Sequence, residues 1–165
     1  MRYSATMKTK FSLTRSAATG AATPRPRWLV VDDTEGVLEL MATLLERFGA
    51  AEICRAHSGP EALELFAGAP EAFTFVVTDF EMPGMNGAEL CRQLHALSPR
   101  LPILLATGSA ELSAEVAQEL GFCGLLFKPF PLEDLSRAVA DAGVLGEPRR
   151  ESAAKSSNHE AALAA

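Results

Sequence analysis

Five apolar segments alternate with five amphipathic segments between Arg27 and Gly143, and this alternation limits the folds that the chain can adopt. Unbroken apolar runs are typical of strands buried on both faces of a parallel sheet. The second segment instead alternates and carries charge, which favours a position at the edge of the sheet. The predicted strands are residues 28–31, 52–55, 73–77, 103–105 and 125–127.

Helical spacing of apolar side chains predicts a helix after each strand. Ser58 and Asn86 are expected to cap the second and third helices, since their side-chain oxygens suit free backbone N–H groups. The fourth helix has the weakest pattern, in which Leu112, Val116 and Leu120 stand four apart. Five βα units with right-handed crossovers predict an α/β fold, a doubly wound five-stranded parallel sheet of flavodoxin-like order 2-1-3-4-5.

Charge is distributed unevenly along the chain. Residues 1–31 hold six basic and no acidic side chains, so the remainder carries a net charge of −12 within a total of −6. An acidic body argues against direct DNA binding, because phosphate backbones favour basic surfaces. No apolar run approaches the length of a membrane span, so we expect no membrane contact. The three cysteines are widely spaced, which favours buried thiols in a reducing compartment and therefore a cytoplasmic protein.

Composition also divides the chain into three parts. Residues 1–25 are rich in Ser, Thr, Ala and Arg and are expected to form a disordered basic extension. The folded domain is predicted for residues 26–143, and residues 144–165 are predicted to be a flexible tail. Since this tail is too short for a DNA-binding or enzymatic module, we expect a stand-alone domain that acts through protein contacts.

Reactive side chains follow four of the five predicted strands. They are Asp32 and Asp33 after the first strand, Asp79 after the third, Thr107 at the end of the fourth and Lys128 after the fifth. In a sheet of this order the carboxyl ends of the first and third strands meet at the switch point, where ligands bind. Carboxylates crowded there repel one another, and Mg²⁺ would relieve that repulsion.

These residue types suit phosphoryl transfer to a carboxylate. Asp79 can act as the nucleophile, while Mg²⁺ and the Lys128 ammonium neutralise the transferred group and the Thr107 hydroxyl binds one of its oxygens. Each feature also has a purely structural interpretation: Asp33 followed by Thr34 is a good helix N-cap, residues 82–87 could be only a turn, and Lys128 could be a surface lysine. The joint order of the features favours the functional interpretation.

Four segments carry a resemblance to a known family. Residues 30–33, 78–87, 106–108 and 127–130 are similar to the signature blocks of bacterial response-regulator receiver domains of the CheY-like type. The resemblance covers residues 27–143. It implies that Asp79 is the phosphoacceptor and that Thr107 and Lys128 contact the phosphoryl group. It also implies a Mg²⁺ site formed by Asp32, Asp33, Asp79 and the backbone carbonyl of Glu81, and a cis bond between Lys128 and Pro129.

The resemblance further implies partners. The phosphoryl donor would be a phosphohistidine on a histidine kinase or a histidine phosphotransfer protein. A downstream protein would bind the face formed by the fourth helix, fifth strand and fifth helix, and receivers of this type can also form homodimers. Such a protein promotes its own phosphorylation and dephosphorylation and is not a turnover enzyme. Leu125 stands where many members carry Tyr or Phe, so the usual switch between Thr107 and that aromatic side chain is not expected in its usual form.

Two other functions compete with this interpretation. A haloacid-dehalogenase-like phosphatase also uses an aspartyl phosphate, but its first motif needs Asp-x-Asp, and the sequence at residues 32–34 is Asp-Asp-Thr. A phosphorylation-independent interaction module with the same fold is the second alternative. The presence of both Asp79 and Lys128 argues against that module.

Overall fold

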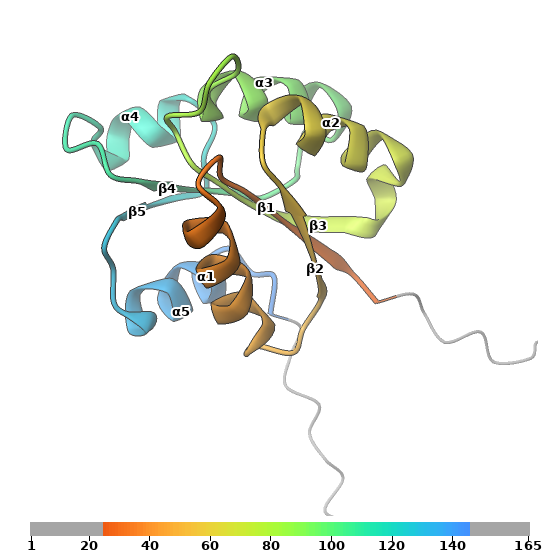
Figure 1. Cartoon of the computed structure of the whole chain (residues 1–165), viewed down its shortest axis with the longest axis horizontal. Helices are drawn as coiled ribbons and strands as arrows, with labels where there is room; N and C mark the ends of the chain where they lie inside the picture. Colours follow the sequence, from red (N-terminus) through yellow and green to blue (C-terminus); the bar gives the residue numbers. More distant parts are fainter. Residues whose placement is uncertain (1–24, 146–165) are drawn as a thin grey trace, which may run out of the picture.

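The computed structural model describes residues 25–145, and these form one five-stranded parallel sheet with helices on both faces (Figure 1). The strand order is β2-β1-β3-β4-β5, which confirms the predicted doubly wound α/β fold and places the charged second strand at an edge. The strands are β1 (Arg27–Val31), β2 (Glu52–Ala56), β3 (Phe73–Thr78), β4 (Ile103–Thr107) and β5 (Gly124–Phe127).

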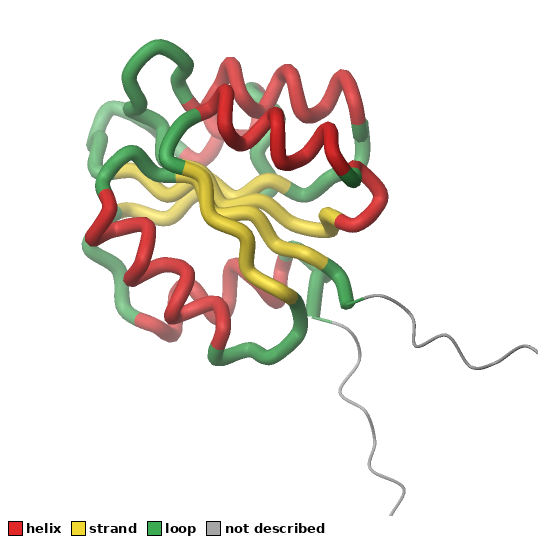
Figure 2. The backbone as a smooth tube through the Cα atoms, turned by 45° about the vertical axis from the view of Figure 1, so that its right-hand side comes forward, coloured by secondary structure: helices red, strands yellow, loops and turns green. Residues whose placement is uncertain are grey.

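The helices form a layer on each side of the sheet (Figure 2). Helices α1 (Glu35–Glu46) and α5 (Leu132–Asp141) cover one face. The other face carries α2 (Gly59–Gly68), α3 (Gly87–Leu97) and α4 (Ala114–Glu119), and a short 3₁₀ helix, Pro70–Ala72, precedes β3. None of the helices in this part of the chain has the length and apolar character that a membrane crossing requires.

Side-chain caps fix where the helices on the second face begin. The Ser58 hydroxyl accepts a hydrogen bond from the Glu61 amide at 3.3 Å, and the Asn86 side chain accepts one from the Glu89 amide at 2.9 Å. Both caps were predicted. Ser113 caps α4 in the same way, which the sequence pattern did not reveal. Each such cap contributes about 1 kcal/mol to helix stability.

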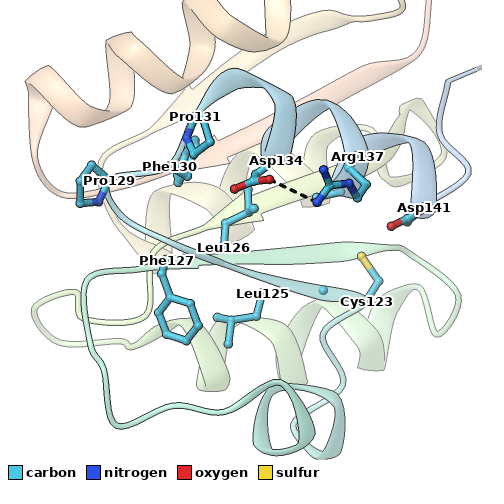
Figure 3. Close-up of a pocket in the computed structure, with 12 residues that line it drawn as sticks. Cys123, Leu125, Leu126, Phe127, Pro129, Phe130, Pro131, Asp134, Arg137 and Asp141 are labelled. Carbon is cyan, nitrogen blue, oxygen red and sulfur yellow. Dashed lines mark hydrogen bonds and ion pairs between the residues drawn. The ribbon is translucent and has the colours of Figure 1, made fainter.

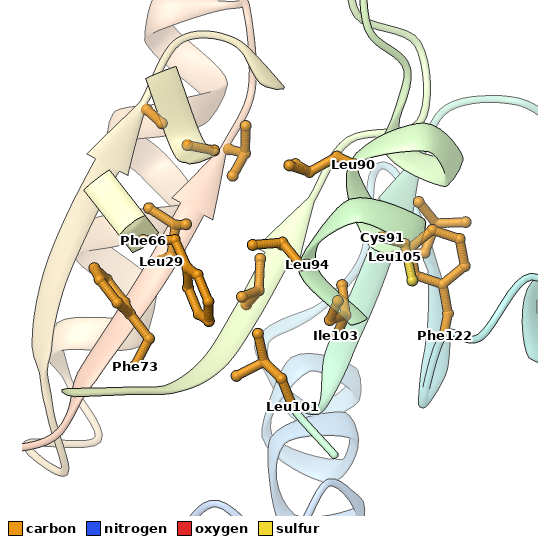
Figure 4. Packing of buried hydrophobic residues seen from close by; sticks show 14 of the residues in the cluster. Leu29, Phe66, Phe73, Leu90, Cys91, Leu94, Leu101, Ile103, Leu105 and Phe122 are labelled. Carbon is orange, nitrogen blue, oxygen red and sulfur yellow. The ribbon is translucent and has the colours of Figure 1, made fainter. Parts of the chain in front are cut away.

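The continuous apolar strands contribute side chains to two separate cores, one under each helical layer. Leu29, Phe66, Leu90 and Leu105 belong to the core under α2, α3 and α4 (Figure 4). The core under α1 and α5 centres on Trp28, whose ring meets Phe75 edge-on at 5.4 Å. Complete burial of a large apolar side chain stabilises a fold by about 1.5–3 kcal/mol. Successive residues of a central strand belong to opposite cores, as Trp28 and Leu29 do in β1, so each such strand packs against both helical layers.

Helix α4 departs from its predicted pattern. Of the three residues spaced four apart, Leu112 packs against the core, but Val116 and Leu120 are exposed and Ala117 is the one buried residue of the helix. The cysteine prediction is also only partly right, because Cys91 is buried whereas Cys123 is exposed. A helix whose core contact is a single methyl group is held weakly by packing.

The predicted terminal segments 1–25 and 144–165 lie almost entirely outside the described residues. At the carboxyl end of the described chain, Val144 and Leu145 still pack against the core under α1 and α5.

Candidate functional site

Asp32, Asp79 and Lys128 meet at the carboxyl edge of the sheet. The Lys128 ammonium donates to Asp32 Oδ2 at 2.5 Å and to Asp79 Oδ1 at 2.7 Å. Both carboxylates are buried, with exposed fractions of 4% for Asp32 and 9% for Asp79. One cation is therefore shared by two carboxylates that have little access to bulk water.

Strand register brings these three residues together although they are far apart in the sequence. Strands β1 and β3 are neighbours, with Val31 paired to Thr78, so the next residue of each strand is an aspartate at the same edge. The Asp79 amide donates to the Val31 carbonyl at 2.9 Å, which extends the pairing into the site. On the other side, the Lys128 amide donates to the Thr107 carbonyl at 2.8 Å.

Hydrogen bonds satisfy every oxygen of the two buried carboxylates. Asp32 Oδ1 accepts from the Thr34 amide at 2.9 Å, and Asp79 Oδ2 accepts from the Glu81 amide at 2.8 Å. The remaining oxygen of each carboxylate accepts from Lys128. Buried charges persist only when they are paired and hydrogen-bonded in this way.

The two carboxylates also change the acidity of Lys128. Burial alone pushes the pKa of this ammonium down, because it removes water from the charged form. The hydrogen bonds to Asp32 and Asp79, together with their charges, outweigh burial, so the net effect raises the pKa of Lys128 above its ordinary value. The side chain is therefore a positive charge throughout the neutral range.

The loop after β3 folds closely over Asp79. The Gly87 amide donates to the Phe80 carbonyl at 2.9 Å, and a Cβ at position 87 would collide with the Asp79 carbonyl oxygen. Glycine at this position therefore allows the first turn of α3 to lie against the backbone of Asp79. The Thr78 hydroxyl, which is fully buried, also donates to the Asp79 carbonyl, at 2.9 Å.

Asp33 and Thr107 lie at the same edge but differ in their surroundings. Asp33 is exposed, and within residues 25–145 no hydrogen bond or ion pair engages its carboxylate. The helix N-cap is Thr34, without a side-chain cap bond, so the cap expected at Asp33 and Thr34 falls on Thr34 and does not account for the Asp33 side chain. Thr107 is fully buried, and its hydroxyl accepts from the Ser109 amide at 3.1 Å.

The donor set at this edge suits a hard cation that retains water. Its side-chain donors are carboxylate oxygens, and one of the three carboxylates, Asp33, faces solvent. Among residues 25–145, no three Asp, Glu, His or Cys side chains converge into a cluster that could enclose a metal alone. Mg²⁺ needs no such cage, since it binds through one or two carboxylates and keeps several waters.

Sequence reasoning missed two features of the site. It assigned Lys128 to a future phosphoryl group, whereas the ammonium already bridges Asp32 and Asp79. It gave Glu81 a role through its carbonyl only, whereas the Glu81 amide holds Asp79 Oδ2. Backbone amides leave no residue-specific signal, so this second contact could not have been found from residue types. The Lys128–Pro129 bond is cis, as the resemblance implied.

A groove of about 520 Å³ lies beside β5 and α5, next to the strand that carries Lys128 (Figure 3). Leu125 and Phe127 lie next to each other on one side of β5, and Asp134 and Arg137 lie on the other side. Arg137 donates to Asp134 at 3.3 Å. Phe127 is 48% exposed although its Cα pairs with that of Thr107 on β4. A large apolar side chain is thus exposed one residue before the site lysine.

Comparisons with known proteins agree with this geometry. The response regulator receiver domain family matches residues 28–140. Response regulator MprA from Mycobacterium ulcerans is 41% identical over 111 residues, which is 66% of this chain and 46% of that protein. The chain thus spans about half the length of the curated relatives it matches.

Solved structures show the same fold. A response regulator receiver domain protein from Clostridium thermocellum has a TM-score of 0.66 and 31% identity, and the match covers 71% of this chain and 93% of that one. Response regulator TrrA from Thermotoga maritima, solved in complex with Mg²⁺ and BeF, has a TM-score of 0.63 and 27% identity, with 71% of this chain and 98% of that one covered.

Proposed function

Because this chain belongs to the response regulator receiver family of two-component signalling proteins, we propose that it accepts a phosphoryl group on Asp79. The observation that carries this proposal is the hydrogen bonding of Asp79. One carboxylate oxygen faces the Lys128 ammonium and the other faces the Glu81 amide, so the nucleophile is fixed between two donors. Such donors also stabilise the negative charge of a phosphoryl group in transfer.

The phosphoryl donor is a phosphohistidine on a histidine kinase or a histidine phosphotransfer protein. A carboxylate oxygen of Asp79 attacks phosphorus while the bond from phosphorus to the imidazole nitrogen breaks. The electron pair of that bond returns to the imidazole, which takes a proton from water, and Asp79 becomes an acyl phosphate. Lys128 moves its hydrogen bond from the Asp79 carboxylate to a phosphoryl oxygen, and the Thr107 hydroxyl binds another.

Mg²⁺ would be held by Asp33, Asp32, Asp79 and the carbonyl of Glu81. When bound, this ion supplies positive charge that neutralises the phosphoryl oxygens. The TrrA structure from Thermotoga maritima, which contains Mg²⁺ with BeF, supports this assignment by similarity. The exposed Asp33 carboxylate supports it from this chain, because it can take up an aqueous cation without first breaking a bond within residues 25–145.

Phosphorylation then acts as a switch. It adds about −1.5 to −2 charges beside Lys128, which draws Thr107 and the loop after β4 inward. Thr107 is tied to β5, since its carbonyl accepts from the Lys128 amide, so movement there reaches the neighbouring Phe127. A complete change of population between two states needs about 5.5 kcal/mol of differential interaction. Charge-assisted hydrogen bonds from Lys128 and Thr107 supply energy of that order.

The output surface is the face formed by α4, β5 and α5. It exposes three large apolar side chains, Val116, Leu120 and Phe127, and borders the groove of Figure 3. Apolar side chains of this kind serve as anchors in protein interfaces. A downstream protein that binds this face, or a second copy of the chain, would read the phosphorylation state. The free thiols of Cys54, Cys91 and Cys123 fit a reducing, cytoplasmic setting.

Intact-mass spectrometry tests the proposed chemistry. The protein is incubated with Mg²⁺ and acetyl phosphate, a small phosphodonor, next to the Asp79→Asn variant. One base-labile phosphoryl adduct in the wild type and none in Asp79→Asn is the expected result. If the wild type stays unmodified, the phosphorylation-independent interaction module is the better description. If Asp79→Asn still gains the adduct, a different carboxylate is the acceptor.

A further inference from the structure

The loop from Asp79 to Gly87 touches helix α2 at one close contact. A Cβ built at Gly59, in the first turn of α2, would lie 2.5 Å from Met85 Sδ, 2.8 Å from Met85 Cγ and 2.9 Å from Met85 Cβ. Side chains essentially never approach a real Cβ within 3.0 Å. The Met85 side chain therefore occupies the space that any other residue at position 59 would fill.

A substitution at Gly59 could not be relieved by the flexible end of Met85 alone. The Met85 thioether can swing away, but the conflict extends to Met85 Cβ, which is fixed to the loop backbone. Either α2 or the loop must then move. The start of α2 is held by its Ser58 cap and by the Glu61 carboxylate, which accepts from the His57 amide at 2.7 Å. The loop is thus the part that gives way.

The other end of the loop cannot absorb that displacement. The first turn of α3 lies directly on the Asp79 carbonyl, as the collision at Gly87 shows, and the Gly87 amide is bonded to the Phe80 carbonyl. Within the loop, the Met85 amide donates to the Pro83 carbonyl at 2.9 Å. A shift at Met85 is therefore passed towards Glu81, whose amide holds Asp79 Oδ2.

We propose that the contact between Gly59 and Met85 positions the loop from Asp79 to Gly87. This contact keeps the Glu81 amide hydrogen-bonded to Asp79 and keeps the Glu81 carbonyl in the position where it would bind Mg²⁺. Gly59 and Met85 are positioning residues in this account, and neither touches the phosphoryl group. Helix α2, which supplies none of the side chains assigned to the chemistry, thereby acts on the site. This inference rests on the proposed function for its role in phosphorylation, although the contact itself can be tested without phosphate.

The first test is Gly59→Ala, with Gly68→Ala as the matched control in the same helix. A Cβ at Gly68 would meet nothing within 4 Å, so that variant should behave as wild type. In metal-free protein, NMR hydrogen exchange of the Glu81 amide should become faster in Gly59→Ala and stay unchanged in Gly68→Ala. A Mg²⁺ titration without phosphodonor should show about tenfold weaker binding in Gly59→Ala only, the size expected when a supporting contact of a metal site is lost.

Removing the whole Met85 side chain gives the decisive comparison. In the Met85→Gly background all three collisions disappear, including the one with Met85 Cβ, so Gly59→Ala should change Mg²⁺ binding and Glu81 exchange by much less than in the wild-type background. Thermal unfolding of each variant shows that binding is compared among folded proteins. Equal effects in both backgrounds, or a Gly59→Ala protein that matches wild type, would overturn the proposal.

Failure of this inference is distinguishable from failure of the proposed function. If wild-type protein gains no phosphoryl adduct, the proposed function is wrong, yet Glu81 exchange in the metal-free variants still reports on the contact. If the adduct forms normally in wild type and Gly59→Ala leaves Glu81 exchange and Mg²⁺ binding unchanged, the phosphoacceptor assignment stands and the positioning role is wrong.

Discussion

The edge of the sheet that carries Asp32, Asp79 and Lys128 is built differently from the face formed by α4, β5 and α5. At the edge, each oxygen of the two buried carboxylates accepts a hydrogen bond, and strand pairing continues into the site. On the face, α4 has six residues with one of them buried, and Val116 and Phe127 are exposed.

The difference separates a fixed chemical site from an adaptable surface. The proposed phosphoryl transfer needs a nucleophile and cations in set positions, which well-satisfied hydrogen bonds provide. A surface that changes with phosphorylation, as proposed for this face, needs two arrangements of similar free energy, and segments with little buried apolar area have small opening energies. Thr107 and Phe127, paired across β4 and β5, lie where the two regions join.

Removal of the shared cation should damage the edge most. Lys128→Met leaves the Asp32 and Asp79 carboxylates unneutralised and removes the charge that would face the phosphoryl group. We expect the rate of phosphorylation by acetyl phosphate to fall by about 100-fold or more, as for loss of a main electrostatic stabiliser. The rate is measured by intact-mass spectrometry. Arg137→Met, which removes an exposed cation from α5, is the control and should leave the rate unchanged; a similar loss in both variants would contradict a specific role for Lys128.

The two neighbouring aspartates should separate stability from metal binding. Asp32 is buried and bonded to Lys128 and to the Thr34 amide, so Asp32→Asn should lower the metal-free free energy of unfolding by about 1–3 kcal/mol. Exposed Asp33 makes no such bonds within residues 25–145, so Asp33→Asn should change the free energy of unfolding by less than about 0.5 kcal/mol. Asp33→Asn should nevertheless weaken Mg²⁺ binding, about tenfold.

Denaturant unfolding without metal and a Mg²⁺ titration measure these two quantities for the aspartate variants. Equal stability losses in the two variants would show that Asp33 is not free to receive a cation. Unchanged Mg²⁺ binding in Asp33→Asn would remove this carboxylate from the metal site.

Truncation on the face should have little effect on the resting protein. Phe127 is half exposed, so Phe127→Ala should change the free energy of unfolding by about 0.5 kcal/mol or less and leave the phosphorylation rate intact. Leu126→Ala, the buried neighbour in β5, is the comparison and should cost about 2–5 kcal/mol in chemical denaturation. A Phe127→Ala loss as large as that of Leu126→Ala would mean that the face is part of the rigid core.

The charge of Lys128 should have only a small effect on how the free energy of unfolding depends on pH. Because its pKa is raised in the folded protein, Lys128 stabilises the fold fully below its ordinary pKa of about 10.4 and loses that effect only as pH rises through the higher folded value. The stability difference between wild type and Lys128→Met should therefore be constant from pH 7 to about pH 10. Denaturant midpoints across this range check it, and a difference that already shrinks between pH 8 and pH 9 would indicate a lowered pKa.

The reactive residues at the strand ends could be predicted from sequence because the strand and the residue after it are both visible locally. An apolar run marks each central strand, and the reactive residue comes directly after it, as Asp32 does after Val31 and Asp79 after Thr78. The rule that parallel strands present their carboxyl ends at one edge then joins them in space. The alternation of strands and helices predicts the fold, and that rule then predicts which residues meet in the candidate site.

Contacts between separate loops were not predictable. The hydrogen bond from the Glu81 amide to Asp79 and the packing of Met85 on Gly59 depend on the backbone conformations of the loops. Residue types alone do not predict those conformations. Helix α4 shows a different limit. The apolar residues recur every fourth position, but the helix begins after Ser113 and ends before Leu120. The apolar pattern therefore extends beyond both ends of the helix.

Hydrogen-exchange mass spectrometry tests the central claim most directly. Exchange is compared between protein with Mg²⁺ alone and protein kept phosphorylated by excess acetyl phosphate, with Asp79→Asn treated identically. We predict that phosphorylation changes exchange across residues 108–127 more than across residues 79–87, and that Asp79→Asn shows no change. Unaltered exchange across residues 108–127 in phosphorylated protein, or the same change in Asp79→Asn, would contradict the coupling of a fixed Asp79 site to an adaptable face.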